Sequence, residues 1–310
     1  MKKATRLAYG EALAEFGSDK NIVVVDADLS GSTMTKFFKD AYPERFFNTG
    51  IAEANMISSA AGMATCGKTV FASSFAIFAA IRAAEQIRNS VCYPALNVKI
   101  AATHAGISVG EDGATHQAIE DLAVMRAIPN LIVIQPVDAN ETRQAVKAII
   151  DYKGPVYLRL GRLPVDNVNK EDYKFEIGKG VELADGKDLT IVATGLMVKS
   201  ALDAKDLLAK EGISARVINI HTLKPIDKDI LIKAAKETGA LVTAEEHNII
   251  GGLGSAVSEV LSENYPAPLE RVGVEDKFGK SGKPADLLQM YGLTPENIVK
   301  KAKAVLARKK

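Results

Sequence analysis

Cysteine is scarce in this sequence, in which Cys66 and Cys92 are the only two among 310 residues. Two cysteines cannot form a disulfide framework, and such sparse use is typical of proteins from a reducing compartment. A strong charge of one sign is also lacking, because the net charge is +1 with 25% charged residues. That balance gives no electrostatic basis for nucleic acid or an anionic membrane surface as the main partner. A small polar ligand fits the composition better.

Long hydrophobic runs and a secretory leader are missing as well. The apolar runs are too short and too rich in Gly or Ala to span a bilayer. The first residues include the lysines of a secretory n-region, but Arg6, Glu11 and Glu15 interrupt any apolar segment after them. We therefore expect a soluble, cytoplasmic protein that has no membrane partner.

What the sequence does contain is an alternation of short Val/Ile-rich runs with longer segments of helical period. Because runs such as NIVVVDAD are continuously apolar, they predict parallel strands that are buried on both faces under helices. A polar stretch that contains Pro164 and lacks a helical period interrupts this pattern. The sequence thus predicts an α/β protein with two doubly wound domains. The first domain covers residues 1–165, a linker covers 166–184 and a smaller domain covers 185–310.

Two apparent nucleotide-binding motifs do not meet their structural requirements. Residues 62–69, GMATCGKT, match the P-loop pattern, which needs a strand before the loop and a helix after it. Here a predicted helix comes first and a strand follows, so Gly67 is better interpreted as a helix stop. The segment GGLGSAVSEV is a weak match to a dinucleotide fingerprint, since Val257 stands where the third Gly or Ala belongs.

Candidate site residues lie in the loops after predicted strands, where open parallel sheets bind ligands. The loop THAGISVGEDGATHQ places His104, Asp112 and His116 within thirteen positions, among three glycines that let the backbone approach a ligand. A metal site is a competing interpretation, although no close ligand pair such as His-x-x-x-His is present. A plain loop in which His116 caps a helix is another.

Glu53 opens a predicted helix in the segment FFNTGIAEANM. A carboxylate in this apolar and amide-rich setting is partly desolvated unless something binds it. It could equally be an ordinary first-turn glutamate that the helix dipole favours. The segment alone leaves both interpretations open.

A resemblance to a known family rests on four segments: FFNTGIAEANM, SSFAIF, THAGISVGEDGATHQAIEDLAVMRAIPNLIVIQPVDANE and VTAEEHNIIGGLGSAVSEVL. They resemble the second half of transketolases and, more loosely, of deoxyxylulose-phosphate synthases. The match runs over nearly the whole chain, and GEDGATHQ is its most specific element. The β subunits of 2-oxo-acid dehydrogenases resemble the chain in fold and in the glutamate segment, but their loop sequence does not replace GEDGATHQ. The resemblance implies a pyrimidine-binding domain followed by a transketolase C-terminal domain.

The resemblance also implies a cofactor, thiamine diphosphate, and the residues that contact it. Glu53 matches the glutamate that hydrogen-bonds the aminopyrimidine ring and, by protonating a ring nitrogen, favours the tautomer that activates the cofactor. Phe75 and Phe78 match the aromatic residues that pack on the pyrimidine, although such residues are also ordinary core. Ile81 stands where many relatives have another aromatic residue.

Substrate-binding residues follow from the same resemblance. His104 and His116 match histidines that contact the sugar, and Asp112 matches the carboxylate that recognises a donor hydroxyl. Asp28 matches an active-site carboxylate near Ser32. The sugar-phosphate clamp is matched by three residues, Arg6, Ser32 and Arg159, while Arg162 competes with Arg159 because the spacing in RLGRLP allows more than one alignment.

A diphosphate site is absent from the sequence, since no Gly-Asp-Gly motif occurs. The resemblance therefore implies a separate partner chain that holds Mg²⁺ and the diphosphate, with two copies of each chain and the active site between them. The expected activity is transfer of a two-carbon ketol unit between sugar phosphates. Alternatives are the β subunit of a 2-oxo-acid dehydrogenase, half of a deoxyxylulose-phosphate synthase, or a non-catalytic regulatory subunit, because fold does not imply function.

Overall fold

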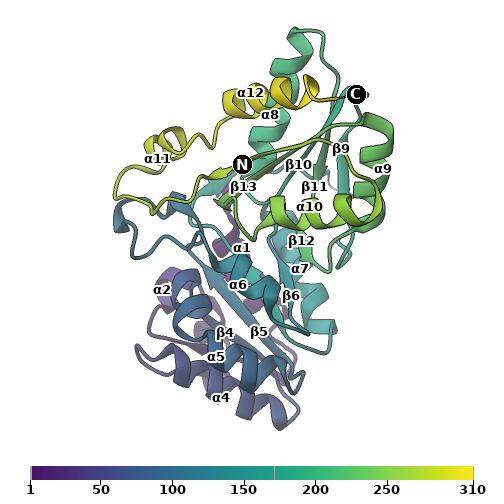
Figure 1. The fold of residues 1–310 in the computed structure, drawn as a ribbon. Coiled ribbons are helices and arrows are strands. Elements are labelled where there is room, and N and C mark those ends of the chain that lie inside the picture. The colour runs from purple at the N-terminus through teal and green to yellow at the C-terminus, as the bar shows by residue number, and fades with distance from the viewer. Residues whose placement is uncertain (1, 171, 310) are drawn as a thin grey trace.

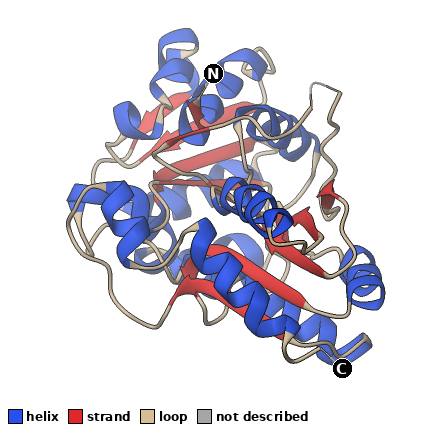
Figure 2. Ribbon diagram, turned by 90° about the horizontal axis from the view of Figure 1, so that it is seen from above, coloured by secondary structure: helices blue, strands red, loops and turns tan. Residues whose placement is uncertain are grey.

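Two α/β domains lie one above the other in the computed structural model, which describes residues 2–170 and 172–309 (Figure 1). Helices cover both faces of each mainly parallel sheet (Figure 2). The predicted fold class is confirmed. None of the helices among the described residues combines the length and apolar character needed to cross a lipid bilayer.

The first sheet has seven strands in the order β12-β6-β7-β5-β4-β2-β3. All neighbouring pairs are parallel except β12 with β6. Every residue of the four central strands β2, β4, β5 and β7 is buried, as continuous apolar runs predict. The strands are β2 (Ile22–Asp26), β3 (Phe46–Asn48), β4 (Thr69–Phe75), β5 (Val98–Thr103), β6 (Ile132–Ile134), β7 (Val156–Arg159) and β12 (Thr222–Lys224).

Two groups of helices enclose this sheet. One face packs on α1 (Thr5–Phe16), α3 (Lys36–Ala41) and α7 (Ala139–Asp151). The other packs on α4 (Glu53–Thr65), α6 (Asp121–Ala127) and the segment from residue 78 to 92, in which the short α5 (Ala84–Gln86) lies between π-helical turns η2 (Phe78–Arg82) and η3 (Ile87–Cys92). Shorter elements are α2 (Ser30–Thr33), η1 (Pro43–Arg45), the 3₁₀ helix η4 (Ile107–Asp112), and the paired strands β1 (Lys3–Ala4) and β8 (Pro164–Val165).

The second sheet has five strands in the order β14-β13-β10-β11-β9. They are β9 (Val181–Ala184), β10 (Leu189–Ala193), β11 (Ala215–Asn219), β13 (Leu241–Asn248) and β14 (Leu269–Val274), and only β9 pairs antiparallel within the described part of this sheet. The helices of this domain are α8 (Met197–Lys210), α9 (Lys228–Thr238), α10 (Leu253–Asn264), α11 (Pro284–Met290) and α12 (Pro295–Leu306). The sheet already includes residues 181–184 of the predicted linker, whose bounds stay a prediction.

The two domains share structure across their junction. Strand β12 belongs to the second half of the chain but pairs with β6 of the first sheet. Apolar residues of α9 and α10 belong to the same buried cluster as those of α4 and α6. The order at the P-loop-like segment is helix α4, then Gly67 at φ +83°, then strand β4, which confirms Gly67 as a helix stop.

Candidate active site

The carboxyl edge of the first sheet gathers most of the predicted site residues. Strands β2, β4, β5 and β7 are parallel, so their carboxyl ends meet at one edge. Phe75 ends β4, His104 follows β5 and Arg159 ends β7. The first residue of α4, Glu53, reaches the same edge through Ser74 of β4.

Glu53 is a buried carboxylate with two hydrogen-bond donors. Its side chain is 1% exposed. The Ser74 hydroxyl donates to Oε1 at 3.3 Å, and an Arg82 guanidinium nitrogen donates to Oε2 at 2.8 Å. The amino end of α4 favours the negative charge, and the Arg82 cation offsets the cost of burying it. Arg82 itself is 49% exposed, so the ion pair lies between the interior and solvent.

Four aromatic side chains continue from this carboxylate. The rings of Phe75 and Phe78 stack with centroids 5.8 Å apart and planes 15° apart. His104 stacks on Phe75 at 3.9 Å, and His116 meets Phe78 edge-on at 5.3 Å. The structure thus brings the two predicted cofactor-packing residues against the two predicted sugar-binding histidines. Ile81, in contrast, has an exposed side chain.

His104 is held as a neutral imidazole. It adopts a left-handed φ of +56°, and its Nδ1 lies 2.9 Å from the Thr103 hydroxyl. Burial lowers the pKa of His104 to about 3, with further lowering by the nearby charges of Arg6 and Arg162 and by His116. A neutral imidazole can donate a hydrogen bond from one nitrogen and accept one at the other.

The low pKa of His104 gives a stability prediction. As pH falls through 6.5, the unfolded chain binds a proton at this histidine that the folded chain does not bind until about pH 3. Its contribution to stability is therefore complete above pH 6.5 and is lost toward pH 3, by up to about 1.4 kcal/mol per pH unit. We expect the free energy of unfolding, measured with urea, to fall more between pH 6.5 and 4.5 in the wild type than in His104→Asn. Asparagine is chosen because it accepts the left-handed φ at this position. Equal slopes would contradict this assignment.

Arg6 and Arg162 bring two cations together beyond the histidines. Arg6 donates to the carbonyl of Ser32 at 2.7 Å. Arg162 donates to the carbonyl of Val109, and its Nη1 lies 3.5 Å from Asp112 Oδ2. Burial lowers the pKa of Arg6, and the nearby charge of Arg162 lowers it further. Two converging guanidinium groups are suited to binding an anion.

The loop after β2 is held by the buried carboxylate of Asp26, the last residue of that strand. Asp26 accepts a hydrogen bond from the Thr33 hydroxyl at 2.7 Å, and burial raises its pKa. Asp28 stands exposed at φ +63° and accepts from Asn48 Nδ2 at 2.8 Å. Asp26 thereby holds in place the loop that carries both Asp28 and Ser32.

Arg159 has a different environment from that expected of a clamp residue. Its side chain is 1% exposed, and its Nε and Nη2 donate to the two carboxylate oxygens of Asp121 at 2.8 and 3.0 Å. Burial, the largest single influence, would raise the pKa of Asp121, but the charge and hydrogen bonds of Arg159, together with His247 and the Tyr157 hydroxyl, lower it overall. Nη2 also donates to the carbonyls of Ala118 and Glu246. The structure thus places Arg159 in a buried ion pair and Arg162 beside Asp112, and a role of either arginine in phosphate binding stays a prediction.

The second domain contacts the loop after β5, which carries His104 and Asp112. Glu246 of β13 accepts a hydrogen bond from the Ser108 N–H at 2.6 Å. Gly106 has φ +86°, and a Cβ there would lie 2.3 Å from the Glu246 carboxyl carbon, so only glycine permits this approach. Burial raises the pKa of Glu246 to about 7. The C-terminal domain therefore shapes the loop that carries His104 and Asp112.

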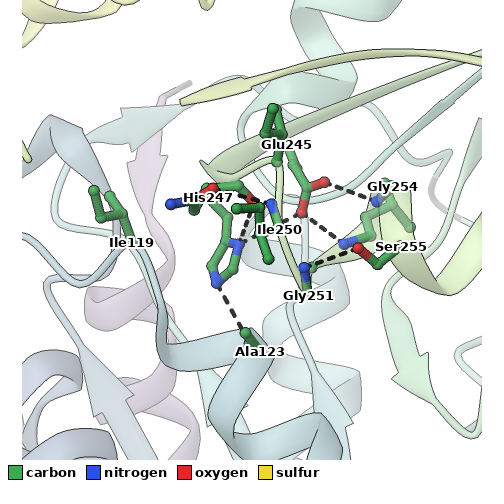
Figure 3. A network of polar contacts seen from close by, with 12 residues as sticks. Ile119, Ala123, Glu245, His247, Ile250, Gly251, Gly254 and Ser255 are labelled. Atoms are coloured by element: carbon green, nitrogen blue, oxygen red, sulfur yellow. Dashed lines mark hydrogen bonds and ion pairs between the residues drawn. The ribbon is translucent and has the colours of Figure 1, made fainter. Parts of the chain in front are cut away.

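A neighbouring network joins β13 to the segment after that loop (Figure 3). The Asn248 N–H donates to the Ile119 carbonyl at 2.8 Å, and the Ala123 N–H approaches His247 Nε2 at 3.4 Å. Glu245 accepts from two N–H groups at the start of α10, those of Leu253 and Gly254. A carboxylate of the chain itself therefore occupies the helix start that a dinucleotide fingerprint would offer to a pyrophosphate.

Comparisons with known proteins give a consistent result. Residues 1–166 match the family described as the transketolase pyrimidine binding domain, and residues 178–298 match the transketolase C-terminal domain. The chain belongs to the transketolase family. It corresponds to the C-terminal section of transketolases, as the sequence resemblance indicated.

Three relatives illustrate the transketolase match. A putative transketolase C-terminal section from Methanocaldococcus jannaschii is 55% identical, and the match covers 96% of this chain and 95% of the relative. A 6-deoxy-6-sulfo-D-fructose transketolase subunit from a Clostridium species is 45% identical, with coverage of 98% and 95%. A solved structure described as a split gene transketolase in an inactive β4 tetramer has a TM-score of 0.92, with 55% identity and full coverage of both chains.

A transketolase pyrimidine-binding domain implies thiamine diphosphate, and the residues present fit one part of it. A buried carboxylate, linked through Arg82 to one of two stacked phenyl rings, provides a charged partner and a flat apolar surface for an aminopyrimidine ring. The Arg82 guanidinium, which is planar and carries N–H donors, already makes both kinds of contact there. Across residues 2–170 and 172–309, no group of three or more His, Cys, Asp or Glu side chains could hold a metal ion.

Two residues of this transketolase site, Arg82 and Glu246, were not predicted from the sequence. Arg82 is the one basic residue in the Ala-rich run AAIRAAEQ, and this isolated charge was the available signal. Glu246 lies in the segment AEEHN, which carried the family resemblance without any assigned role.

Proposed function

We propose that this chain, together with a partner chain, transfers a two-carbon ketol unit from a ketose phosphate to an aldose phosphate. The observation that carries the proposal is the buried Glu53 carboxylate, which Arg82 links to Phe78 and its stacked neighbour Phe75. Neutral His104 continues the same surface. Thiamine diphosphate, when bound, supplies a carbon nucleophile and an electron sink. Glu53 would hold a proton at a ring nitrogen of the pyrimidine, and the two phenyl rings would orient that ring.

The sugar would lie along the histidines. His104 and His116 would hydrogen-bond sugar hydroxyls and move protons at the reacting oxygen atoms, and Asp112 would accept from a donor hydroxyl. Arg6 and Arg162 would bind the anionic end, with the Ser32 loop beside them and Asp28 at its start. One relative is named for a sulfonated sugar, and guanidinium groups bind a sulfonate or a phosphate alike. The chain's Arg6 and Arg162 therefore support an anionic sugar as substrate.

The C-terminal section of a split enzyme implies a second chain that supplies the other section. We propose that this partner holds Mg²⁺ and the diphosphate, that two copies of each chain assemble, and that the active site forms between them. The relative whose structure is described as an inactive β4 tetramer supports the expectation that this chain is inactive alone.

The test is reconstitution. The chain, its co-purified partner and thiamine diphosphate with Mg²⁺ should convert a ketose phosphate and an aldose phosphate, and neither chain alone should do so. Pyruvate offered as the donor separates ketol transfer from the 2-oxo-acid dehydrogenase and deoxyxylulose-phosphate synthase alternatives. A complex that binds the cofactor but turns over neither donor would favour a regulatory role.

Arg162 gives a specific prediction for substrate binding. Arg162→Gln should raise the KM for a phosphorylated ketose about 10- to 100-fold and leave kcat within a few-fold, because the interaction is the same in the ground and transition states. The KM for the unphosphorylated ketose should not change. Arg143→Gln, which removes a surface arginine paired with Glu15, is the matched control. Equal losses with both ketoses would contradict a role in phosphate binding.

A further inference from the structure

Arg82 makes two contacts that the proposed function reserves for the cofactor. Its Nη1 donates to Oε2 of Glu53 at 2.8 Å. The carbon centre of its guanidinium also lies 4.4 Å from the ring centroid of Phe78. The first is a hydrogen bond to the catalytic carboxylate, and the second is a cation–π contact with the aromatic surface.

The position of Arg82 is set by an unusual backbone. Residues Phe78–Arg82 form a π-helical turn, and Ala83 then departs from helical geometry at φ −110° and ψ 19°. A π-turn advances with i→i+5 hydrogen bonds, so it rotates the following side chains relative to an α-helix, and such turns are frequent at functional sites. This winding places Phe78 at one end of the turn and Arg82 at the other, with the guanidinium over the ring.

The exposure of the two partners shows which of them can move. Glu53 is 1% exposed and receives a second hydrogen bond from Ser74, so it is fixed. The Arg82 side chain is 49% exposed, so its guanidinium has solvent beside it into which it can turn. A guanidinium can therefore leave this carboxylate for water when an incoming ring takes over its hydrogen bond, while the bond from Ser74 is kept.

We propose that Arg82 is an internal stand-in for the aminopyrimidine ring, which keeps Glu53 and Phe78 occupied until the cofactor displaces it. A planar cation with N–H donors meets the carboxylate and the phenyl ring in the way that a protonated aminopyrimidine would. Arg82 is thus an autoinhibitory contact of the chain on its own. The proposal rests on the proposed function, because it takes Glu53 and Phe78 as the pyrimidine site.

The test measures binding of thiamine, which carries the aminopyrimidine without the diphosphate, to the isolated chain by NMR titration. Arg82→Ala should bind thiamine about tenfold more tightly than the wild type, because the ring no longer competes with a guanidinium. Arg82→Lys should fall between the two, since an ammonium keeps the charge but lacks the planar fork. Arg88→Ala, which removes an exposed arginine bonded to its neighbour Asn89, should behave as the wild type.

Two controls separate the possible outcomes. Circular dichroism and thermal unfolding verify that the Arg82 variants are folded. In a Glu53→Gln background, Arg82→Ala should change the affinity for thiamine by less than twofold. If Arg82→Ala bound thiamine as tightly as the wild type or more weakly, the proposal would be overturned. Arg82 would then either help the aminopyrimidine ring to bind or have no contact with its site. The outcome does not depend on turnover, so a reconstituted complex without ketol transfer would count against the proposed function alone.

Discussion

Glu53→Gln in the reconstituted complex should lower kcat by at least about 100-fold, the usual range for loss of a proton-transfer residue. Glutamine keeps the size of the side chain but can neither hold nor release the proton at a pyrimidine nitrogen. The KM for the ketose phosphate should stay within a few-fold, because the proposed sugar site lies along the histidines and not at Glu53. Steady-state ketol transfer, with saturating thiamine diphosphate and Mg²⁺, measures both constants.

A matched control is available for this prediction. Glu263→Gln removes an exposed carboxylate at the end of α10, which is paired at 3.6 Å with Lys228, and should leave kcat unchanged. Arg82 loses its partner in Glu53→Gln, but its guanidinium is already half in water, so the chain should remain folded. Turnover of Glu53→Gln within twofold of the wild type would rule out Glu53 as the catalytic carboxylate.

Arg159→Met should destabilise the chain by about 3–5 kcal/mol, the cost of leaving a buried charge without its partner. Asp121 is fully buried, and its oxygens receive two hydrogen bonds from Arg159 and one from the Tyr157 hydroxyl. The methionine is similar in length, so most of the loss reflects the orphaned carboxylate and not a cavity. Urea unfolding of the purified chain at pH 7 measures it.

A double variant and a surface pair sharpen the Arg159 result. Arg159→Met combined with Asp121→Leu should recover part of the loss, since replacing both members of a buried pair by apolar residues is often nearly neutral. Asp151→Asn breaks the exposed pair with Lys147 and should change stability by less than about 0.5 kcal/mol. If Arg159→Met were as mild as Asp151→Asn, the buried pair would not be a structural element.

The sequence predicted the parallel sheets because continuous apolar runs such as Ile22–Asp26 have few other uses in a folded chain. It also located the helix that begins at Glu53. It could not choose between Arg159 and Arg162, since both stand at the end of one strand. Their different environments depend on Asp121, which reaches Arg159 from 38 residues away in the chain.

The hydrophobic periodicity of the sequence could not predict two other features, the π-turns and the pairing of β12. The segment RAAEQIRNS (residues 82–90) predicts an ordinary helix, whereas the structure has one π-turn that ends at its first residue and another that begins at Ile87. The first of these turns brings Arg82 over Phe78. Strand β12 is a three-residue run, Thr222–Lys224, whose pairing comes from β6 and not from its own residues. Both depend on contacts that local sequence does not encode.

The placement of β12 makes the chain a single folding unit even though two family domains divide its sequence. A fragment that ends near residue 166 would expose the edge of β6, with its unpaired N–H and C=O groups open to another chain. It would also remove the helices α9 and α10 that complete the core behind α6. The pyrimidine-binding domain can therefore be recognised by its sequence alone. Its folded form, however, includes an edge strand, β12, and part of a hydrophobic core that come from the second half of the chain.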